Sequence, residues 1–215
     1  IVIFDTSPAA ALRIAGDALP GRVRRPLKRW RSGPGVFKVD FAVEGGVPWT
    51  NEWARKAGTL HLAGTFEELN AAEREVHAGR MPDRPFVLVC QQYLADPGRS
   101  AGDVHPVWSY AHVPNGYTGD ATEAITDQIE RFAPGFRDRI VAKTTTGPAQ
   151  LEAHNANYAG GDIGGGANDA WQVVMRPRFS PDPYSLGAKG LYLCSASTPP
   201  GGGVHGMGGF HAATA

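Results

Sequence analysis

The chain has 215 residues, a length typical of one domain or two small ones. Lys plus Arg and Asp plus Glu number 21 each, so the formal net charge is zero, which argues against nucleic acid or an anionic membrane as the main partner. Hydrophobic residues make up 42% and charged residues 20%, the balance of a folded globular chain. No apolar run approaches the ~20 residues of a transmembrane span, and no signal peptide is expected.

The two cysteines, Cys90 and Cys194, both lie in apolar, strand-like runs. A secreted disulfide scaffold needs more cysteine than this. We therefore expect a reducing, cytoplasmic location, with both thiols packed as small hydrophobic side chains. A disulfide between them stays an open alternative. The start at Ile1, directly in a strand-like run, suggests a chain cut from a longer one, by processing or by tag removal.

The first elements are predicted as a strand over residues 1–4 and a helix that Ser7 caps and Pro8 begins, ending at Gly16. Residues 21–31 carry six positive charges, with apolar residues at helical spacing on the opposite face. A docking surface for a membrane or an acidic partner is one interpretation, and a solvated helix face is the one we favour. Pro26 must then lie in the first turn or kink this helix.

Alternating apolar residues predict a half-buried strand over 35–43, and a capping box at Thr65 and Glu68 begins a helix that runs to about Val76. A second helix starts at Asp120 and stops at Pro134. Residues 147–166 are expected to form a long glycine-rich loop, and a helix could follow Val204. Further strands are expected at 58–63, 86–92, 107–113, 140–146 and 190–194. Strands and helices mix without a βαβ rhythm, so the predicted fold class is α+β.

The stretch from Gly190 to Ala215 is the richest in possible chemistry. A short apolar strand leads into Ser195 and Ala196, then into a proline- and glycine-rich turn, and then into a possible helix. Glycines let a ligand approach the backbone closely, and a helix start offers unpaired N–H groups and a positive dipole end. Such a place favours an anion or an electron-rich carbonyl. A plain loop with tight turns is the alternative.

The residues GLYLCS at 190–195 and PPGGGVHG at 199–206 resemble the carboxy-terminal signature of phytoene-desaturase-like FAD-dependent oxidoreductases. Supporting similarity lies at 33–40, at 128–136, at Arg176-Pro177 and at 183–185. The resemblance covers most of the chain. It implies a split FAD-binding domain, whose closing strand, glycine turn and helix return to the flavin, with a substrate domain of mixed or antiparallel sheet and helices in between.

By this resemblance, residues 1–32 are a strand and helices that link the FAD-binding domain to the substrate domain. Residues 33–176 are the substrate-binding domain, and residues 177–215 are the carboxy-terminal part of the FAD-binding domain. The resemblance places Ser195 and Ala196 near the ribityl chain or pyrophosphate. It places the proline- and glycine-rich turn against the flavin ring, and His205 next to the edge of the ring that this turn faces. The residues expected to bind the cofactor are Ser195, Ala196, Pro200, Gly201, Gly202, Gly203, Val204 and His205.

The sequence departs from the family at the dinucleotide fingerprint. No G-x-G-x-x-G follows an early strand and opens a helix in a βαβ unit. We therefore expect a carboxy-terminal fragment that lacks the βαβ half, holds FAD weakly or not at all by itself, and needs the missing amino-terminal FAD-binding half as its partner. Strands of a sheet without its centre would leave open edges, which favour self-association.

Other groups of residues give weaker evidence for a functional site. The seven histidines show no tight metal-ligand spacing, so no metal site is expected, and Ser195 is not in a G-x-S-x-G elbow. Cys194 as a thiol nucleophile is disfavoured by its apolar strand. Trp108 and Tyr110 share one strand face and are the preferred wall of a substrate pocket, although core packing is the common role of aromatic residues.

Two functions follow as hypotheses. The first is the substrate-domain and flavin-side portion of an FAD-dependent oxidoreductase, which dehydrogenates a largely apolar small molecule by hydride transfer to flavin. For this reaction no general base can be named from the sequence. The second is a non-catalytic module that binds a small ligand or a partner without FAD.

Overall fold

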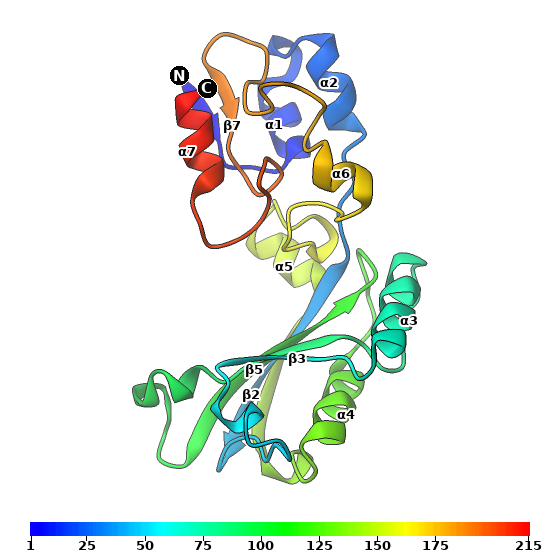
Figure 1. Ribbon diagram of the computed structural model, residues 1–215, viewed down its shortest axis with the longest axis vertical. Coiled ribbons are helices and arrows are strands. Elements are labelled where there is room, and N and C mark those ends of the chain that lie inside the picture. The colour runs from blue at the N-terminus through cyan, green and yellow to red at the C-terminus, as the bar shows by residue number, and fades with distance from the viewer. The chain divides into compact units, whose positions relative to one another are not determined.

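The computed structural model describes residues 1–215, which divide into two compact units. The first unit joins Ile1–Gly33 to Glu152–Ala215, and the second is Pro34–Leu151 (Figure 1). The chain thus leaves the first unit after Gly33 and returns to it at Glu152, whereas the sequence places the second boundary near residue 176. The mixture of antiparallel and parallel strands with helices confirms the α+β class.

The second unit is built on a five-stranded sheet whose neighbouring strands are all antiparallel, in the order β3-β4-β5-β2-β6. The strands are β2 (Gly35–Glu44), β3 (Thr59–Leu62), β4 (Val87–Cys90), β5 (Val104–Val113) and β6 (Ile140–Thr146). Two helices complete the unit, α3 (Phe66–His77) and α4 (Thr122–Phe132). The strand predicted around Val89 is β4, and it is hydrogen-bonded to a neighbour on both sides.

The alternating pattern of β2 puts one face of this sheet into the core. Phe37, Val39, Phe41 and Val43 are all buried and form one cluster with residues of the neighbouring strands. The apolar stripe of α4, including Ile125 and Ile129, packs into the same cluster. The residues between them in the strands, such as Lys38 and Asp40, are half-buried on the opposite face of the sheet.

Glu68 ties α3 to two arginines. Its Oε2 accepts a hydrogen bond from the Thr65 N–H at 2.9 Å and completes the predicted capping box. Its Oε1 forms ion pairs with Arg131 at 3.0 Å and with Arg84 at 3.2 Å. These bonds to the ionised carboxylate, led by the one from Arg131, lower the pKa of Glu68 from 4.5 to about 2.

A Glu68→Gln variant tests this network by its response to acid. Because the folded-state pKa is lowered, the contribution of Glu68 is present above the unfolded pKa and is lost as pH falls through about 2. We expect the melting temperature of the natural chain to fall more steeply than that of Glu68→Gln between about pH 4.5 and 2, by circular dichroism. Glu52→Gln, at an exposed position without an ion pair, is the control. Identical acid profiles for Glu68→Gln and the natural chain would refute the prediction.

The first unit contains two short parallel strands and five helices. The strands are β1 (Val2–Phe4) and β7 (Leu191–Leu193), which pair directly although they come from opposite ends of the sequence. Its core gathers residues of α1, α2, both strands and the segments beside them: Phe4, Ala11, Leu19, Val23, Leu27, Leu186 and Leu193. Four helices lie wholly in this unit, α1 (Pro8–Ala15), α2 (Gly21–Lys28), α6 (Ala170–Val174) and α7 (Met207–Thr214). The fifth, α5 (Pro148–His154), begins in the second unit and ends in this one.

Local signals located several of these elements and missed others. Ser7 caps α1, Gly16 ends it, and a helix follows Val204, all as predicted. The segment expected as one loop over 147–166 instead contains α5, and the short helix α6 was not predicted. Both helices are too short for a 3.6-residue apolar period to become visible. Pro26 lies at the sixth position of α2, past the first turn, and the helix ends two residues later.

Short 3₁₀ turns connect these elements at Gly16–Ala18, Ala54–Lys56, Gln92–Leu94, Pro97–Arg99, Arg137–Arg139 and Ala159–Gly161. None of the helices combines the length and the apolar character that crossing a bilayer requires.

Candidate functional site

The two parallel strands of the first unit end side by side. Val2, Ile3 and Phe4 pair with Leu191, Tyr192 and Leu193, and the Cys194 N–H donates to the Phe4 carbonyl at 2.9 Å. The carboxyl ends of the two strands therefore lie side by side (Figure 1). Residues 5–7 follow β1 there, and residues 195–197 follow β7. In parallel sheets, ligands bind in the crevice outside the carboxyl ends of the strands.

The segment after β1 is also the start of α1. The Ser7 Oγ accepts from the Ala10 N–H at 3.2 Å, and the Ser7 N–H donates to the Asn157 side chain at 2.9 Å. Pro8 occupies the first helical position, where no N–H bond is lost. The positive end of the α1 dipole therefore lies in the segment where β1 ends.

A cavity of about 300 Å³ opens at this place. Ser195 and Ala196, two of the residues expected to contact a cofactor, line it together with Gly165 from the glycine-rich segment. The remaining lining residues come from the link between β1 and α1, from residues 155–163 and from the segment after β7: Asp5, Thr6, Ser7, Asn155, Asn157, Tyr158, Ile163 and Ser197.

Asp162 holds the glycine-rich segment in this position. One carboxylate oxygen accepts from the N–H groups of Gly164 (2.7 Å) and Gly165 (3.1 Å). The other accepts from the Gly33 N–H at 2.7 Å. Gly165 has a positive φ of 75°, and a Cβ there would lie 2.8 Å from the Cβ of Ala196. Only glycine therefore allows this segment to lie against the turn after β7.

Arg176 supports the other side of that turn. Its buried guanidinium donates to the Ala196 carbonyl at 2.9 Å, to the Asn168 side chain at 3.0 Å and to the Gln172 carbonyl at 3.3 Å. Burial lowers the pKa of Arg176, an effect that the charge of Asp162 partly opposes. A Cβ on Gly201 would lie 2.9 Å from the Arg176 Nη1 atom, so this glycine permits the close approach.

Sequence reasoning missed both of these supporting residues. Asp162 stands two residues before a run of three glycines, which is the pattern of a carboxylate that bonds the backbone two and three residues ahead. That signal was present in the sequence. The bonds of Asp162 to Gly33 and of Arg176 to Ala196 had no such signal, because their partners are distant along the chain.

The turn from Pro200 to His205 is mostly open to solvent. Gly201 is buried against Arg176, whereas Pro200 and residues 202–205 are exposed, and the Val204 side chain is fully exposed. The His205 Nδ1 accepts from the Met207 N–H at 3.0 Å, so this ring caps the first residue of α7. The next two N–H groups, of Gly208 and Gly209, donate to no other group of the chain.

Gly208 brings the start of α7 against the end of β7. A Cβ at this position would lie 2.4 Å from the Cys194 carbonyl oxygen and 3.3 Å from the Thr198 Oγ1. The first turn of α7 therefore packs directly on the segment that follows β7. The exposed turn, the helix start and the cavity lined by Ser195 and Ala196 thus belong to one region of the first unit.

Trp108 and Tyr110 belong to the second unit, on β5. As their spacing predicts, they share one strand face, with ring centroids 6.1 Å apart and nearly parallel planes. Both are half-buried, and the Lys38 Nζ lies 5.9 Å from the centre of the Trp108 ring, while its ammonium pairs with Asp40. Burial raises the pKa of Tyr110. The face around them is thus aromatic with one charge pair, and it is opposite the core face of the sheet.

Both cysteines are free in the structure. Cys90 is buried and its sulfur lies 3.3 Å from the Thr59 hydroxyl, whereas Cys194 is half-buried. Burial raises the pKa of the Cys194 thiol, which disfavours the thiolate that a nucleophile needs. No group of three or more His, Cys, Asp or Glu side chains in residues 1–215 is placed to hold a metal ion.

No family model matches this chain. It is 29% identical over 218 residues to pyridine nucleotide-disulfide oxidoreductase domain-containing protein 2 of Rattus norvegicus, covering 91% of this chain and 37% of that protein. The protein of the same name from Mus musculus is 29% identical over 157 residues, covering 67% of this chain and 27% of that protein. The chain thus spans about a third of the length of these relatives. This weak similarity supports a relationship to NAD(P)/FAD-dependent oxidoreductases in the broad sense, without singling out the phytoene-desaturase-like group.

Proposed function

We propose that this chain is the substrate-domain and flavin-side portion of an FAD-dependent oxidoreductase. The observation that carries the proposal is the pairing of β1 with β7, which unites both ends of the sequence in one unit with a cavity at the carboxyl ends of its parallel strands. The broad similarity to oxidoreductases supports the same assignment. The finer assignment, to the phytoene-desaturase-like group with its split FAD-binding domain, rests on the motif at 190–206.

The residues at this place suit the flavin half of FAD. A planar ring needs a surface without protruding side chains, and Gly202 and Gly203 present exposed backbone. The ring also needs donors for its polar edge, and the N–H groups of Gly208 and Gly209 have no partner within the chain. The cavity beside Ser195 and Ala196 offers hydroxyl groups for the polar chain that follows the ring.

In this proposal each group has a physical task. Ser195 and Ala196 border the ribityl chain or pyrophosphate, and Gly202, Gly203 and Val204 face the ring. The α7 start stabilises negative charge near its first turn, and the His205 Nδ1 accepts the hydrogen bond that caps Met207. Arg176 and Asp162 hold the two backbone segments in place. When bound, FAD supplies the hydride acceptor for oxidation of a C–H bond.

The substrate and partners are part of the same proposal. The half-buried aromatic face around Trp108 and Tyr110 suits a largely apolar small molecule. The ADP half of FAD is assigned to a βαβ unit outside these 215 residues, in line with the greater length of the relatives. We further propose a cytoplasmic protein, and self-association of the isolated chain through β1, whose Ile1, Val2 and Ile3 side chains are exposed.

The decisive experiment is to purify the natural protein from its complete coding sequence and to analyse the flavin released by heat. We expect FAD in equimolar amount. A Gly202→Val substitution, which places a branched side chain on the exposed turn, is expected to lower the FAD content severalfold. Gly58→Val is the matched control, because a Cβ there meets nothing within 4 Å.

A protein that is colourless and takes up no added FAD would refute the proposal. In that case the alternative stands, a non-catalytic module that binds a small ligand or a partner.

A further inference from the structure

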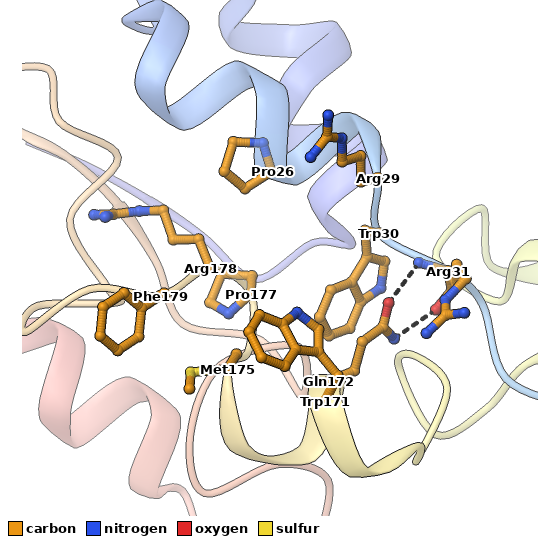
Figure 2. Close-up of a pocket in the computed structure, with 10 residues that line it drawn as sticks. All are labelled: Pro26, Arg29, Trp30, Arg31, Trp171, Gln172, Met175, Pro177, Arg178 and Phe179. Carbon is orange, nitrogen blue, oxygen red and sulfur yellow. Dashed lines mark hydrogen bonds between the residues drawn. The ribbon is translucent and has the colours of Figure 1, made fainter.

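The first unit contains a second and larger cavity, of about 490 Å³, which shares no lining residue with the one beside Ser195. It lies where the end of α2 meets α6 and the segment that follows it (Figure 2). Its ten lining residues include three aromatic side chains and three arginines but no Asp or Glu.

Two of the three aromatic side chains are open to solvent although they are large and apolar, and Trp30 is half-buried. Trp171 is 67% exposed and Phe179 is 80% exposed. Trp30 and Trp171 both line the cavity, and their indoles are drawn in the middle of the view in Figure 2. Exposed aromatic rings that gather around a hollow are characteristic of binding sites.

The Trp30 indole and the backbone on either side of the cavity are held in place by their surroundings. A Cβ at Gly166 would lie 2.1 Å from the Trp30 ring, so this glycine lets the indole pack on the backbone. The Gln172 amide bonds both the N–H and the carbonyl of Arg31, at 2.9 and 3.0 Å. Asp169 caps α6 by accepting from the Trp171 N–H at 3.1 Å. A framework of this kind reduces the entropy lost when a ligand binds.

The three arginines differ in how far their charge is already compensated. Arg31 pairs with Asp169 at 2.6 Å. Arg29 is exposed and forms no ion pair or hydrogen bond within the chain through its guanidinium. Arg178 bonds only the carbonyls of Asp182 and Ser185, and its buried Nε has no partner. Neither Arg29 nor Arg178 therefore forms an ion pair with a carboxylate, although the charge of Asp182 acts on Arg178.

We propose that this cavity binds a nucleotide-class ligand, with an aromatic base on the indole of Trp171 and phosphate oxygens on Arg29 and Arg178. Guanidinium groups match phosphate oxygens in a planar, bidentate geometry, and bases stack on aromatic faces. An acidic peptide would satisfy the arginines but would leave the flat indole surfaces without a planar partner. The site is separate from the proposed flavin site and does not depend on it.

Calorimetric titration of the 215-residue chain with ADP tests this inference. We expect saturable binding that weakens about tenfold or more in Arg29→Gln and in Trp171→Ala. Adenosine has the base but no phosphate, and inorganic pyrophosphate has phosphates but no base. Both are therefore expected to bind more weakly than ADP. Arg25→Gln, on the same helix but outside the cavity, and Trp53→Ala, at an exposed tryptophan of the other unit, are expected to bind ADP as the natural chain does.

The contrary outcomes are equally specific. Absence of ADP binding, or an equal loss in Arg25→Gln and Arg29→Gln, would overturn the inference, because the second result indicates attraction by net charge alone. Loss of ADP binding in Ile163→Trp, which fills the cavity beside Ser195, together with normal binding in Arg29→Gln, would also overturn it. That result would move the nucleotide to the proposed flavin site and leave the flavin proposal intact.

Discussion

Replacing Phe136 by alanine is expected to lower the free energy of unfolding of the 34–151 unit by about 3–5 kcal/mol. Phe136 is completely buried and stands edge-on to Phe41, with ring centroids 5.2 Å apart. It therefore fills the core between the sheet and the segment that follows α4. Truncation removes the apolar area, the aromatic pair and the packing around them, and leaves a cavity in their place.

Urea unfolding followed by circular dichroism measures this loss. Phe66→Ala is the matched control, because Phe66 lies in the same unit but is 76% exposed, and its truncation is expected to change stability by less than about 0.5 kcal/mol. Equal losses in the two variants would show that Phe136 does not have the core role assigned to it.

Replacing Asp162 by alanine is expected to destabilise the first unit by about 3 kcal/mol or more, since hydrogen bonds to a charged group contribute about 1.5–3 kcal/mol each. Three N–H groups, of Gly33, Gly164 and Gly165, would lose their acceptor. The residue is nearly buried, so water replaces these bonds poorly. The glycine-rich segment would then leave its place beside Ala196, and the FAD content of the natural protein is expected to fall with it.

Two further variants are compared with Asp162→Ala. Asp162→Asn keeps one acceptor oxygen, so its stability is expected to lie between those of the natural chain and Asp162→Ala in thermal unfolding. Asp17→Ala makes the same change in charge in the same unit, but Asp17 forms one exposed ion pair with Arg24 and its loss should matter little. If Asp17→Ala and Asp162→Ala lose the same stability, the three backbone bonds are not the cause.

The site residues that the sequence predicted belong to a local motif, whereas those it missed bind partners far away along the chain. Ser195 and Ala196 were singled out by the motif after the last strand, and the structure places both at one cavity. Residues 202–205 lie on an exposed turn before a helix, which agrees with the local pattern of glycines followed by helix-forming residues. The local bonds of Asp162 to Gly164 and Gly165 had a signal in the sequence. Its bond to Gly33 and the bond of Arg176 to Ala196 had none, because a carboxylate or a guanidinium shows no preference for one distant backbone group over another.

By itself, the sequence determined those features that depend on neighbours a few positions apart. Ser7 caps its helix and Thr65 with Glu68 forms a capping box because donor and acceptor lie within one turn of each other. The alternation around Val39 determines which side of β2 is buried, because side chains of a strand point to opposite faces. The glycines at 201–203 define a turn that no bulky side chain covers.

Only the tertiary structure decided that β1 pairs with β7, that Asp162 reaches Gly33 across 129 positions, and that Trp30 meets the helix carrying Trp171 at one cavity. Each of these contacts joins segments from the two ends of the sequence around the intervening 34–151 unit. The physical reason is that hydrogen bonds and apolar packing act over a few ångströms in space. The partners in these contacts are determined only when the whole unit folds around its core. No local pattern of residues specifies them.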